Sequence, residues 1–357
     1  YVDDIIIISH DTKGILDALK KVPYELKGGV KPTSFLGASI GTYTFKDGTT
    51  TWYMSAQQYL KNAISNIELT LKETIPTPAR ITTPLPHDYH PELDTSPLAD
   101  DTKANFYMSL IGILQWTSEL GRIDITQETG LMSRFNAAPR EGHYNMVLRM
   151  FSYLKKHLNS KLVFDAERRD YSDIDFPKPD WTEQYPYCKE QIPIDAPRAL
   201  GKHVQVTLFV DAAHADCHVT RRSTTGIIIF INGTPIRWYS KRQNTVEAST
   251  YGSEFVAMRI ATELIIALRY NLRMLGIPMD GPANVFCDNQ SVVISSSLPS
   301  SVLKKKHQAI SYHKVRETMA SGAMRIAYEP TGSNLSDILT KCLSGPVHRF
   351  LISHILY

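Results

Sequence analysis

The chain has 357 residues, of which 43% are hydrophobic, a length and composition that suit about two or three folded domains. No stretch approaches the roughly 18 uncharged apolar residues of a membrane-spanning helix, so no membrane partner is expected. The net charge of +3 is unevenly divided: residues 1–199 hold 22 Lys and Arg against 26 Asp and Glu, whereas residues 200–357 hold 17 against 10. The basic C-terminal half is compatible with a polyanionic partner, although an ordinary basic surface explains the charge equally well.

The four cysteines are far apart in the chain and form no CxxC pair. This spacing argues against a structural zinc site and a disulfide scaffold, and an intracellular, reducing compartment is expected. The first residues, Tyr1 to Asp4, are not those of a signal peptide and lack an initiator methionine. We therefore expect a fragment of a longer protein.

In the first half, hydrophobic spacing and turn signals predict a mixed α+β arrangement. Asp47-Gly48 is a strong hairpin signal between two strand-like stretches. From residue 105 to about 157, apolar side chains recur at three- and four-residue steps, which predicts helix throughout. The other elements expected in chain order are a strand over 5–8, helices over 13–21 and 55–66, hairpin strands at 35–37 and 51–54, and a proline-rich connector over 76–97.

A change of composition predicts the domain boundary. Residues 166–201 are charged and aromatic and contain five prolines, which is typical of a linker. We therefore expect a first domain over residues 1–165 and a second over residues 202–357.

After the linker, the pattern predicts an α/β domain with a five-stranded mixed sheet. The first strand, 203–211, alternates apolar and other residues, and Asn232-Gly233 is a preferred hairpin turn between the next two strands. The sheet should be antiparallel at one edge and parallel at the other. The remaining elements are strands at 226–231, 236–239, 285–287 and 325–328, and helices at 250–275, 306–321 and from about 336.

Four acidic residues of this domain are difficult to explain as surface charges. Asp211 and Asp288 each end a predicted strand, and Glu254 lies on the stripe of the long helix that should face the sheet. Asp337 opens the last predicted helix. A carboxylate that faces a core is costly unless it is paired or bound to metal. If the first and fourth strands are adjacent and parallel, Asp211 and Asp288 emerge at one edge, within reach of Glu254.

Such a cluster repels itself unless cations neutralise it, and oxygen ligands favour Mg²⁺ or Mn²⁺. Two ions roughly 4 Å apart would form a phosphoryl-transfer site. Structural roles remain open for single residues: Asp288 as a helix N-cap, Asp337 as a partner of a helix dipole, each worth up to about 1 kcal/mol, and Asp211 as the start of a turn. Glu254 is the hardest to explain in this way.

Several ordered motifs carry a family resemblance. They are VDAAHAD at 210–216, RRSTTG at 221–226, WYSKRQ at 238–243, ASTYGSEFVA at 248–257, CDNQS at 287–291, YHKVRE at 312–317 and LSDILTK at 335–341. Together they resemble the ribonuclease H of copia-type retrotransposon Pol polyproteins. The resemblance implies a ribonuclease H-like fold and cleavage of the RNA strand of RNA–DNA hybrids. It also implies a site with two Mg²⁺ or Mn²⁺ ions, in which Asp211, Glu254, Asp288 and Asp337 are the catalytic, metal-binding residues.

The first half resembles the reverse transcriptase of the same family. YVDD at 1–4 is similar to the catalytic hairpin of the polymerase palm, which implies that Asp3 and Asp4 bind magnesium. Residues 35–37 resemble the region that supports the primer, and stretches within 107–155 resemble the thumb and connection helices. A polymerase also needs a third carboxylate from an earlier palm strand. Because the chain starts after that point, we do not expect this chain by itself to polymerise nucleotides.

The sequence departs from the family pattern near the proposed nuclease site. Gly252 stands where an acidic residue is frequent, Ala213 where Asp is frequent, and His214 where Trp is usual. Residues 331–334 offer no histidine, so no general acid is assigned. These departures keep a non-enzymatic alternative open: a decayed element whose domain folds and binds nucleic acid without cutting it. A DNA-cutting nuclease on the same fold, such as a transposase, is a second alternative.

Binding to a hybrid should rest on contacts to the backbone and minor groove, and should weaken with salt. The expected partners are an RNA–DNA hybrid, single- or double-stranded nucleic acid, and the remainder of Pol. The family places such a protein in the cytoplasm, in a virus-like particle, or in the nucleus. The candidate nucleic-acid contacts are Arg221, Arg222, Ser240, Lys241, Arg242 and the run Lys304, Lys305 and Lys306, for which a solvated charge run is an alternative explanation.

Overall fold

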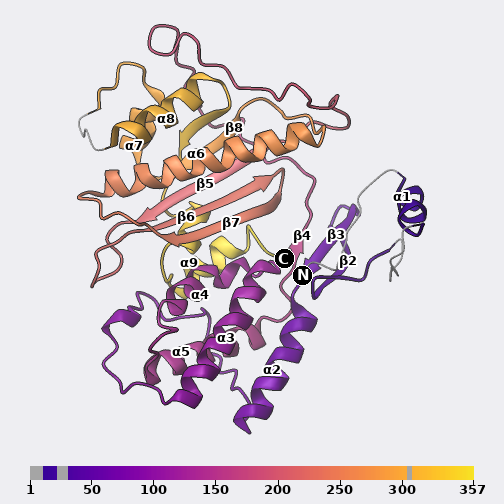
Figure 1. Cartoon of the computed structure of the whole chain (residues 1–357), viewed down its shortest axis with the longest axis vertical. Coiled ribbons are helices and arrows are strands. Elements are labelled where there is room, and N and C mark those ends of the chain that lie inside the picture. Colours follow the sequence, from indigo (N-terminus) through magenta and orange to yellow (C-terminus); the bar gives the residue numbers. More distant parts are fainter. Residues whose placement is uncertain (1–10, 22–30, 304–307) are drawn as a thin grey trace.

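The computed structural model describes residues 11–21, 31–303 and 308–357. The predicted strand over 5–8, together with Asp3 and Asp4, lies outside the described residues, and so does the run Lys304 to Lys306. Among the described helices, none combines the length and apolar character needed to cross a membrane. Within the described residues, the strands form two separate sheets (Figure 1).

The smaller sheet contains the predicted hairpin. Its strands are β1 (Ser34–Phe35), β2 (Ala38–Thr44), β3 (Thr50–Ser55) and β4 (Leu162–Val163), in that order and antiparallel. The turn forms as predicted, because the Asp47 carboxylate accepts a hydrogen bond from the Thr49 backbone N–H at 2.9 Å.

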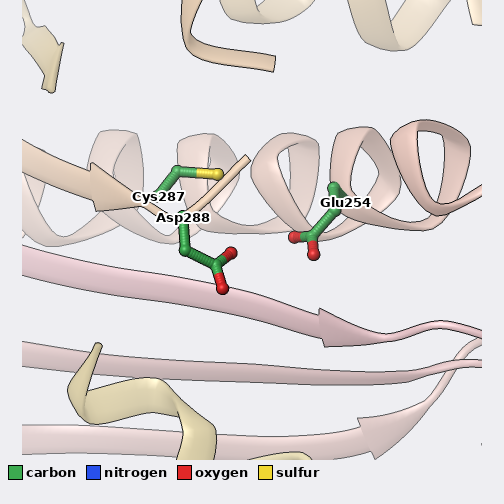
Figure 2. Close-up of side chains that lie close together, drawn as sticks. All are labelled: Glu254, Cys287 and Asp288. Atoms are coloured by element: carbon green, nitrogen blue, oxygen red, sulfur yellow. The ribbon is translucent and has the colours of Figure 1, made fainter. Parts of the chain in front are cut away.

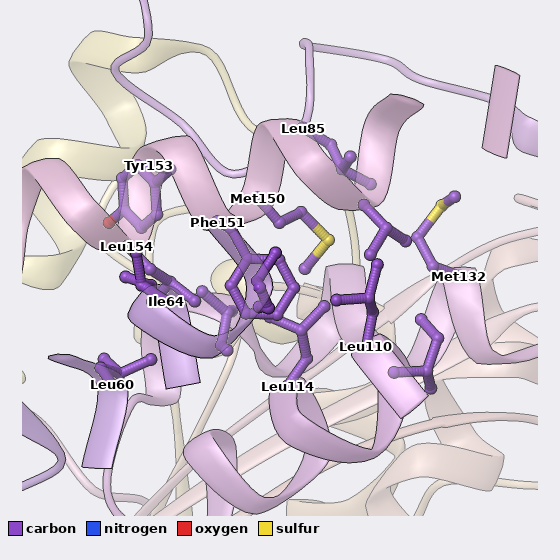
Figure 3. Close-up of a cluster of buried hydrophobic side chains, with 14 of the residues drawn as sticks. Leu60, Ile64, Leu85, Leu110, Leu114, Met132, Met150, Phe151, Tyr153 and Leu154 are labelled. Carbon is purple, nitrogen blue, oxygen red and sulfur yellow. The ribbon is translucent and has the colours of Figure 1, made fainter. Parts of the chain in front are cut away.

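Helices pack beside this sheet around one apolar core. This core includes the fully buried side chains of Leu60, Leu110, Leu114 and Phe151 (Figure 3). Residues 105–157 are largely helical, as predicted, but the helix is interrupted, because the chain turns after Gly121 at φ +100° and Pro139 precedes the last helix of this part. The described helices of this part are α1 (Thr12–Leu19), α2 (Gln57–Leu71), α3 (Asp101–Glu119), α4 (Thr126–Ser133) and α5 (Glu141–Lys156), with 3₁₀ turns η1 (Pro91–Leu93) and η2 (Ile123–Ile125).

The larger sheet has the strand order β7-β6-β5-β8-β9. The β5-β6-β7 strands are antiparallel, whereas β8 is parallel to both β5 and β9, which confirms the predicted mixed sheet. Alternate side chains of β5 enter different cores: Leu208 faces one side and Phe209 the other. The strands are β5 (Val206–Ala213), β6 (Thr224–Ile231), β7 (Thr234–Arg242), β8 (Ala283–Cys287) and β9 (Met324–Tyr328).

Both faces of this sheet are covered. Helices α6 (Thr250–Met274), α7 (Gln290–Ser297) and α8 (Ala309–Ala320) lie on one face (Figure 1). The other face receives the 3₁₀ helix η4 (Leu335–Leu339) and helix α9 (Gly345–Ile352). The last helix predicted from residue 336 is therefore wrong in form: a short 3₁₀ helix comes first, and α9 starts separately with Pro346 in its first turn.

The connector 166–201 contains no helix or strand but packs closely against the larger sheet and its helices. Phe176 and Trp181 are buried in the cores on opposite faces of that sheet. Glu190 pairs with Arg269 and Arg273 of α6, each at 2.6 Å. The domain boundaries stay a prediction, but this connector contributes directly to the cores of the larger sheet.

The helical part and the larger sheet also contact each other. Helix α4 lies against β7 (Figure 1). The Gln127 side-chain amide donates to the Thr340 carbonyl at 3.4 Å, and Cys342 packs into the core of the helical part. The segment that follows η4 is therefore held from the first half of the chain.

Candidate metal-binding site

The four predicted carboxylates come from four different elements of the larger sheet and its covering layers. Asp211 lies in β5, Asp288 directly follows β8, Glu254 lies in α6 and Asp337 in η4. Val210 pairs in register with Cys287, so Asp211 and Asp288 leave neighbouring parallel strands side by side. Asp211 and Asp288, which are 77 positions apart along the chain, therefore meet at one edge, as predicted.

Ligand atoms gather in two groups that share Asp288. The oxygens of Asp211, Asp288 and Asp337 lie within 4.8 Å of one another. In the second group, ligand atoms of Glu254, Cys287 and Asp288 also lie within 4.8 Å of one another. The Glu254 and Asp288 carboxylates face each other (Figure 2). Burial raises the pKa of the Cys287 thiol well above its ordinary value, so it remains protonated and is a poor ligand. The effective donors are the carboxylates.

Glu254 is brought to the cluster by the long helix. The Ser249 side chain caps α6 by accepting from the Gly252 N–H at 3.2 Å. One turn later Glu254 is 3% exposed, and its Oε2 atom has no hydrogen-bond partner among the described residues. Burial, with repulsion from Asp211 and Asp288, raises the pKa of Glu254 to about 10.

Asp337 reaches the cluster because η4 approaches β6 very closely at Gly226. A Cβ atom on Gly226 would lie 2.7 Å from the Ser336 carbonyl and 2.5 Å from the Thr340 side chain. The glycine therefore makes this approach possible. Buried Asp337 leaves its Oδ1 atom without a partner among the described residues, and burial, with repulsion from Asp211, raises its pKa to about 8.

The helix-cap alternative for Asp288 is not supported, whereas Asp337 lies in the first turn of η4, a position compatible with its alternative role as a partner of the helix dipole. Asn289, not Asp288, caps α7 by accepting from the Val292 N–H at 3.2 Å. The N-cap of η4 is Asn334, not Asp337. Asp288 instead accepts a hydrogen bond from Thr331 at 2.9 Å, and burial, with repulsion from Asp211, raises its pKa. The two groups are therefore oriented toward the cluster rather than used as helix caps.

Two residues of the site were missed by sequence reasoning, which quoted them only within a motif. The Thr340 hydroxyl donates to Asp211 Oδ2 at 2.5 Å. The Lys341 ammonium lies 3.0 Å from Asp337 Oδ2 and 3.7 Å from Asp211 Oδ2. Burial disfavours its charge, but attraction by Asp211 and Asp337 prevails and raises its pKa. The four-residue spacing from Asp337 to Lys341 was the available signal.

The donor set fits a divalent cation. Oxygen atoms from several carboxylates converge, and two of those atoms are buried without a partner among the described residues. Burying such atoms without a partner costs free energy. A bound cation would offset the repulsion between the carboxylates and would give the unpartnered oxygens a ligand. Hard oxygen ligands of this kind suit Mg²⁺ or Mn²⁺.

Five of the predicted nucleic-acid contacts lie near the strand ends of the same sheet. Asp211 pairs with Gly226, and Gly226 pairs with Ser240, which places Ser240 two strands, or roughly 10 Å, from the cluster. Lys241 and Arg242 follow Ser240 in β7, and Arg221 and Arg222 lie in the loop between β5 and β6. Arg221 and Lys241 are exposed, and Arg222 and Arg242 are partly buried.

The mixed five-stranded sheet with helices on both faces confirms the α/β arrangement predicted for the second domain. No family model matches the chain. The chain is 25% identical over 346 residues to the retrovirus-related Pol polyprotein from transposon RE1 of Arabidopsis thaliana. The aligned region covers 96% of this chain and 20% of that protein. It is also 25% identical over 351 residues to the retrovirus-related Pol polyprotein from transposon TNT 1-94 of Nicotiana tabacum, and the alignment covers 96% of this chain and 23% of that protein. The predicted resemblance to retrotransposon Pol polyproteins is thus confirmed, and the chain spans about a fifth of the length of these relatives.

Solved structures similar to the chain include ribonuclease H domains. One is the N-terminal ribonuclease H domain of a Mycobacterium tuberculosis protein, with a TM-score of 0.30, 14% identity, and coverage of 42% of this chain and 97% of that chain. Another is LC11-RNase H1 in complex with an RNA/DNA hybrid, with a TM-score of 0.30, 15% identity, and coverage of 38% and 94%.

Proposed function

We propose that the C-terminal part of the chain is the ribonuclease H of a copia-type retrotransposon Pol, and that it hydrolyses the RNA strand of RNA–DNA hybrids with two Mg²⁺ or Mn²⁺ ions. The observation that carries the proposal is the convergence of Asp211, Glu254, Asp288 and Asp337 in two overlapping ligand groups. The similarity to retrovirus-related Pol polyproteins supports the same activity.

The chain's own residues hold and align the reacting groups. When bound, a pair of divalent ions supplies an activated water and stabilises the leaving oxygen. Asp288 belongs to both ligand groups and would link the two ion positions. Glu254 would complete one position, and Asp211 and Asp337 the other. Thr340 fixes Asp211 through its hydroxyl, so this carboxylate is oriented before a ligand arrives.

Hybrid binding would use the residues that flank the cluster. Arg221, Arg222, Lys241 and Arg242 offer charge to phosphates, and the Ser240 hydroxyl offers a hydrogen bond. Such contacts do not read bases, and affinity should fall as salt rises. The run Lys304 to Lys306 stays a candidate outside the described residues.

The N-terminal part is proposed to be the end of a reverse transcriptase, with the small sheet from its palm and the helices from its thumb and connection. Asp3 and Asp4, which the family resemblance gives as magnesium ligands, lie outside the described residues. The rest of a Pol polyprotein is the proposed partner of this part, in a cytoplasmic virus-like particle or in the nucleus.

The test is hydrolysis by the full chain. The purified protein would be incubated with an end-labelled RNA–DNA hybrid and Mg²⁺, with duplex DNA as a second substrate. We expect cleavage of the hybrid RNA, and a loss of at least about 100-fold in Asp211→Asn and Asp288→Asn, because each removes a charged ligand. Asp180→Asn is the matched control, since Asp180 is exposed in the connector.

Intact RNA from a protein with normal circular dichroism and cooperative unfolding would sink the proposal. Tight hybrid binding without cleavage would support the alternative of a decayed element that only binds nucleic acid. The departure at Gly252 motivates this alternative. A Cβ atom there would lie 2.7 Å from Glu247 Oε2 and 2.8 Å from Gln308 Nε2, so an acidic side chain would displace side chains that fill this space. Cleavage of duplex DNA instead of the hybrid would favour a DNA nuclease.

A further inference from the structure

One cation of the protein itself occupies the carboxylate cluster. The Lys341 ammonium contacts Asp337 at 3.0 Å and Asp211 at 3.7 Å. In the described part of the chain, no other Lys or Arg forms an ion pair with any of the four carboxylates. Lys341 is therefore the local counter-ion of this cluster.

The position of this ammonium is asymmetric within the cluster. It contacts two members of the group formed by Asp211, Asp288 and Asp337. The other group contains Glu254, whose Oε2 atom has no hydrogen-bond partner among the described residues. One side of the cluster is thus partly neutralised by the protein, and the other is not.

The backbone that carries Lys341 is fixed from the helical part of the chain. The Thr340 carbonyl accepts from Gln127 at 3.4 Å, and the Cys342 carbonyl accepts from the Asp88 backbone N–H at 3.1 Å. The Cys342 side chain is buried in the core of the helical part. These anchors lie directly on both sides of Lys341, so the scaffold directs its side chain toward the carboxylates.

We infer that Lys341 is a positioning residue that holds Asp211 and Asp337 together in the metal-free protein and competes with a divalent cation for that group. The inference rests on the proposed metal site. The physical reason is electrostatic: an ammonium and a divalent cation that share the same carboxylates repel each other strongly at a separation of a few ångströms. Entry of the cation would require the ammonium to withdraw, and its half-exposed side chain leaves a route toward solvent.

Competition differs measurably from an ordinary structural ion pair. A structural pair contributes the same stability whether or not metal is bound. A competing pair contributes stability only to the metal-free protein, because metal binding displaces it. By linkage, the residue that stabilises the metal-free form must weaken metal affinity by the corresponding factor.

The experiment uses the full chain and Mn²⁺ alone. Mn²⁺ affinity would be measured by isothermal titration calorimetry, and thermal unfolding would be followed in EDTA and in saturating Mn²⁺. The variants are Lys341→Met, which removes the charge, and Lys341→Arg, which keeps it. Lys103→Met is the matched control, because Lys103 forms a half-exposed pair with Glu141 at 2.8 Å, far from the cluster.

We expect Lys341→Met to bind Mn²⁺ about tenfold more tightly than the wild-type protein, within the usual range for linked sites. It should unfold at a lower temperature in EDTA and recover this loss in saturating Mn²⁺. Lys341→Arg should keep the wild-type affinity and the wild-type unfolding temperature in EDTA. Lys103→Met should lose the same stability in both conditions and leave Mn²⁺ affinity unchanged.

Equal destabilisation of Lys341→Met with and without Mn²⁺, or an unchanged or weaker Mn²⁺ affinity, overturns the inference while the metal site stands. If the wild-type protein and the Lys341 variants all fail to bind Mn²⁺, the proposed metal site fails first, and the role of Lys341 fails with it. The two failures are therefore distinguishable in a single set of titrations.

Discussion

In the metal-free protein, a charged Glu254 side chain would destabilise the folded state, because it is buried beside other carboxylates. It is nearly completely buried, Asp211 and Asp288 face it, and its pKa is raised to about 10. Between its ordinary value of 4.5 and this value, the folded protein binds a proton that the unfolded chain has lost. Stability must therefore fall as pH rises through that window.

The substitution Glu254→Gln tests this destabilisation, because the glutamine side chain resembles the protonated, uncharged acid. Without metal, we expect the variant to be more stable than the wild-type protein, with a gap that widens by up to about 1.4 kcal/mol per pH unit between about pH 6 and about pH 8. Saturating Mg²⁺ should stabilise the wild-type protein more than the variant. Urea unfolding at several pH values, with EDTA or Mg²⁺, measures both effects. A gap that does not change with pH would contradict the prediction.

The site residues divide according to what the sequence could reveal. Three carboxylates were predictable as a cluster, because Asp211 and Asp288 end strands and Glu254 lies on a sheet-facing helix position where a charge is costly. Asp337 was expected only from its place at the start of a helix and from the family resemblance. Thr340 and Lys341 were not singled out, because a threonine and a lysine after a helix are ordinary surface residues in a sequence. Only the close approach of η4 to β6 turns them toward Asp211.

At the scale of elements, Gly226 sets the distance between η4 and the sheet. Gly226→Ala should push η4 away, since its Cβ would lie 2.7 Å from the Ser336 backbone oxygen. We expect a loss of about 1–3 kcal/mol in the free energy of unfolding, as in other overpacked cores, together with reduced hybrid cleavage. Gly332→Ala is the control, because no atom lies within 4 Å of the corresponding Cβ position. Equal effects of the two substitutions in urea unfolding would refute this role.

A buried ion pair joins the helices of the first half to the C-terminal helix. Arg122 and Asp124 pair at 2.7 Å, Tyr153 of α5 donates to Asp124 at 2.8 Å, and His348 of α9 lies 3.3 Å from the Asp124 carbonyl. Attraction by Arg122 outweighs the effect of burial and lowers the pKa of Asp124. The carboxylate is therefore charged at neutral pH.

Asp124→Asn should leave the Arg122 charge buried and uncompensated. We expect a loss of about 3–5 kcal/mol in the free energy of unfolding, measured in urea. Asp280→Asn breaks the exposed Arg168–Asp280 pair and should cost at most about 1 kcal/mol. A loss for Asp124→Asn as small as that of this control would show that the buried pair does not hold the helices together.

Prediction of elements succeeded where local signals and tertiary contacts agree. The Asp47-Gly48 hairpin and the strands of the larger sheet formed because turn chemistry and periodicity both favour them. The helical character of residues 105–157 was predictable as well, but periodicity does not reveal where the turns between α3, α4 and α5 fall. The 3₁₀ form of η4 could not be predicted from the sequence, because it depends on the close packing of η4 against Gly226, which is a tertiary contact.

At the scale of the whole molecule, the connector 166–201 behaves as part of the larger sheet's core. Sequence composition predicted a linker, since proline and charged residues usually mark exposed chain. Trp181 is instead buried, and the Arg316 guanidinium lies over its ring at 4.8 Å. The proposed nuclease therefore depends on residues that composition assigns to no domain.

Trp181→Ala in the full chain tests this dependence. Truncating a buried tryptophan leaves a cavity and removes the aromatic contact with Arg316, so we expect a loss of about 3–5 kcal/mol in the free energy of unfolding. Tyr187→Ala, six residues further along the same connector, is the control, because Tyr187 is 94% exposed and should change stability very little.

The burial of connector residues also predicts how stable shorter fragments of the chain should be. A fragment that begins at residue 166 keeps Phe176, Trp181 and Glu190, and should unfold cooperatively at a higher temperature than one that begins at residue 202. The shorter fragment exposes apolar surface on both faces of the sheet and leaves Arg269 without its carboxylate partner. Calorimetry of the two fragments measures the difference. Equal unfolding temperatures would mean that the connector only covers the sheet without stabilising it, and that the boundary predicted from composition is the physical one.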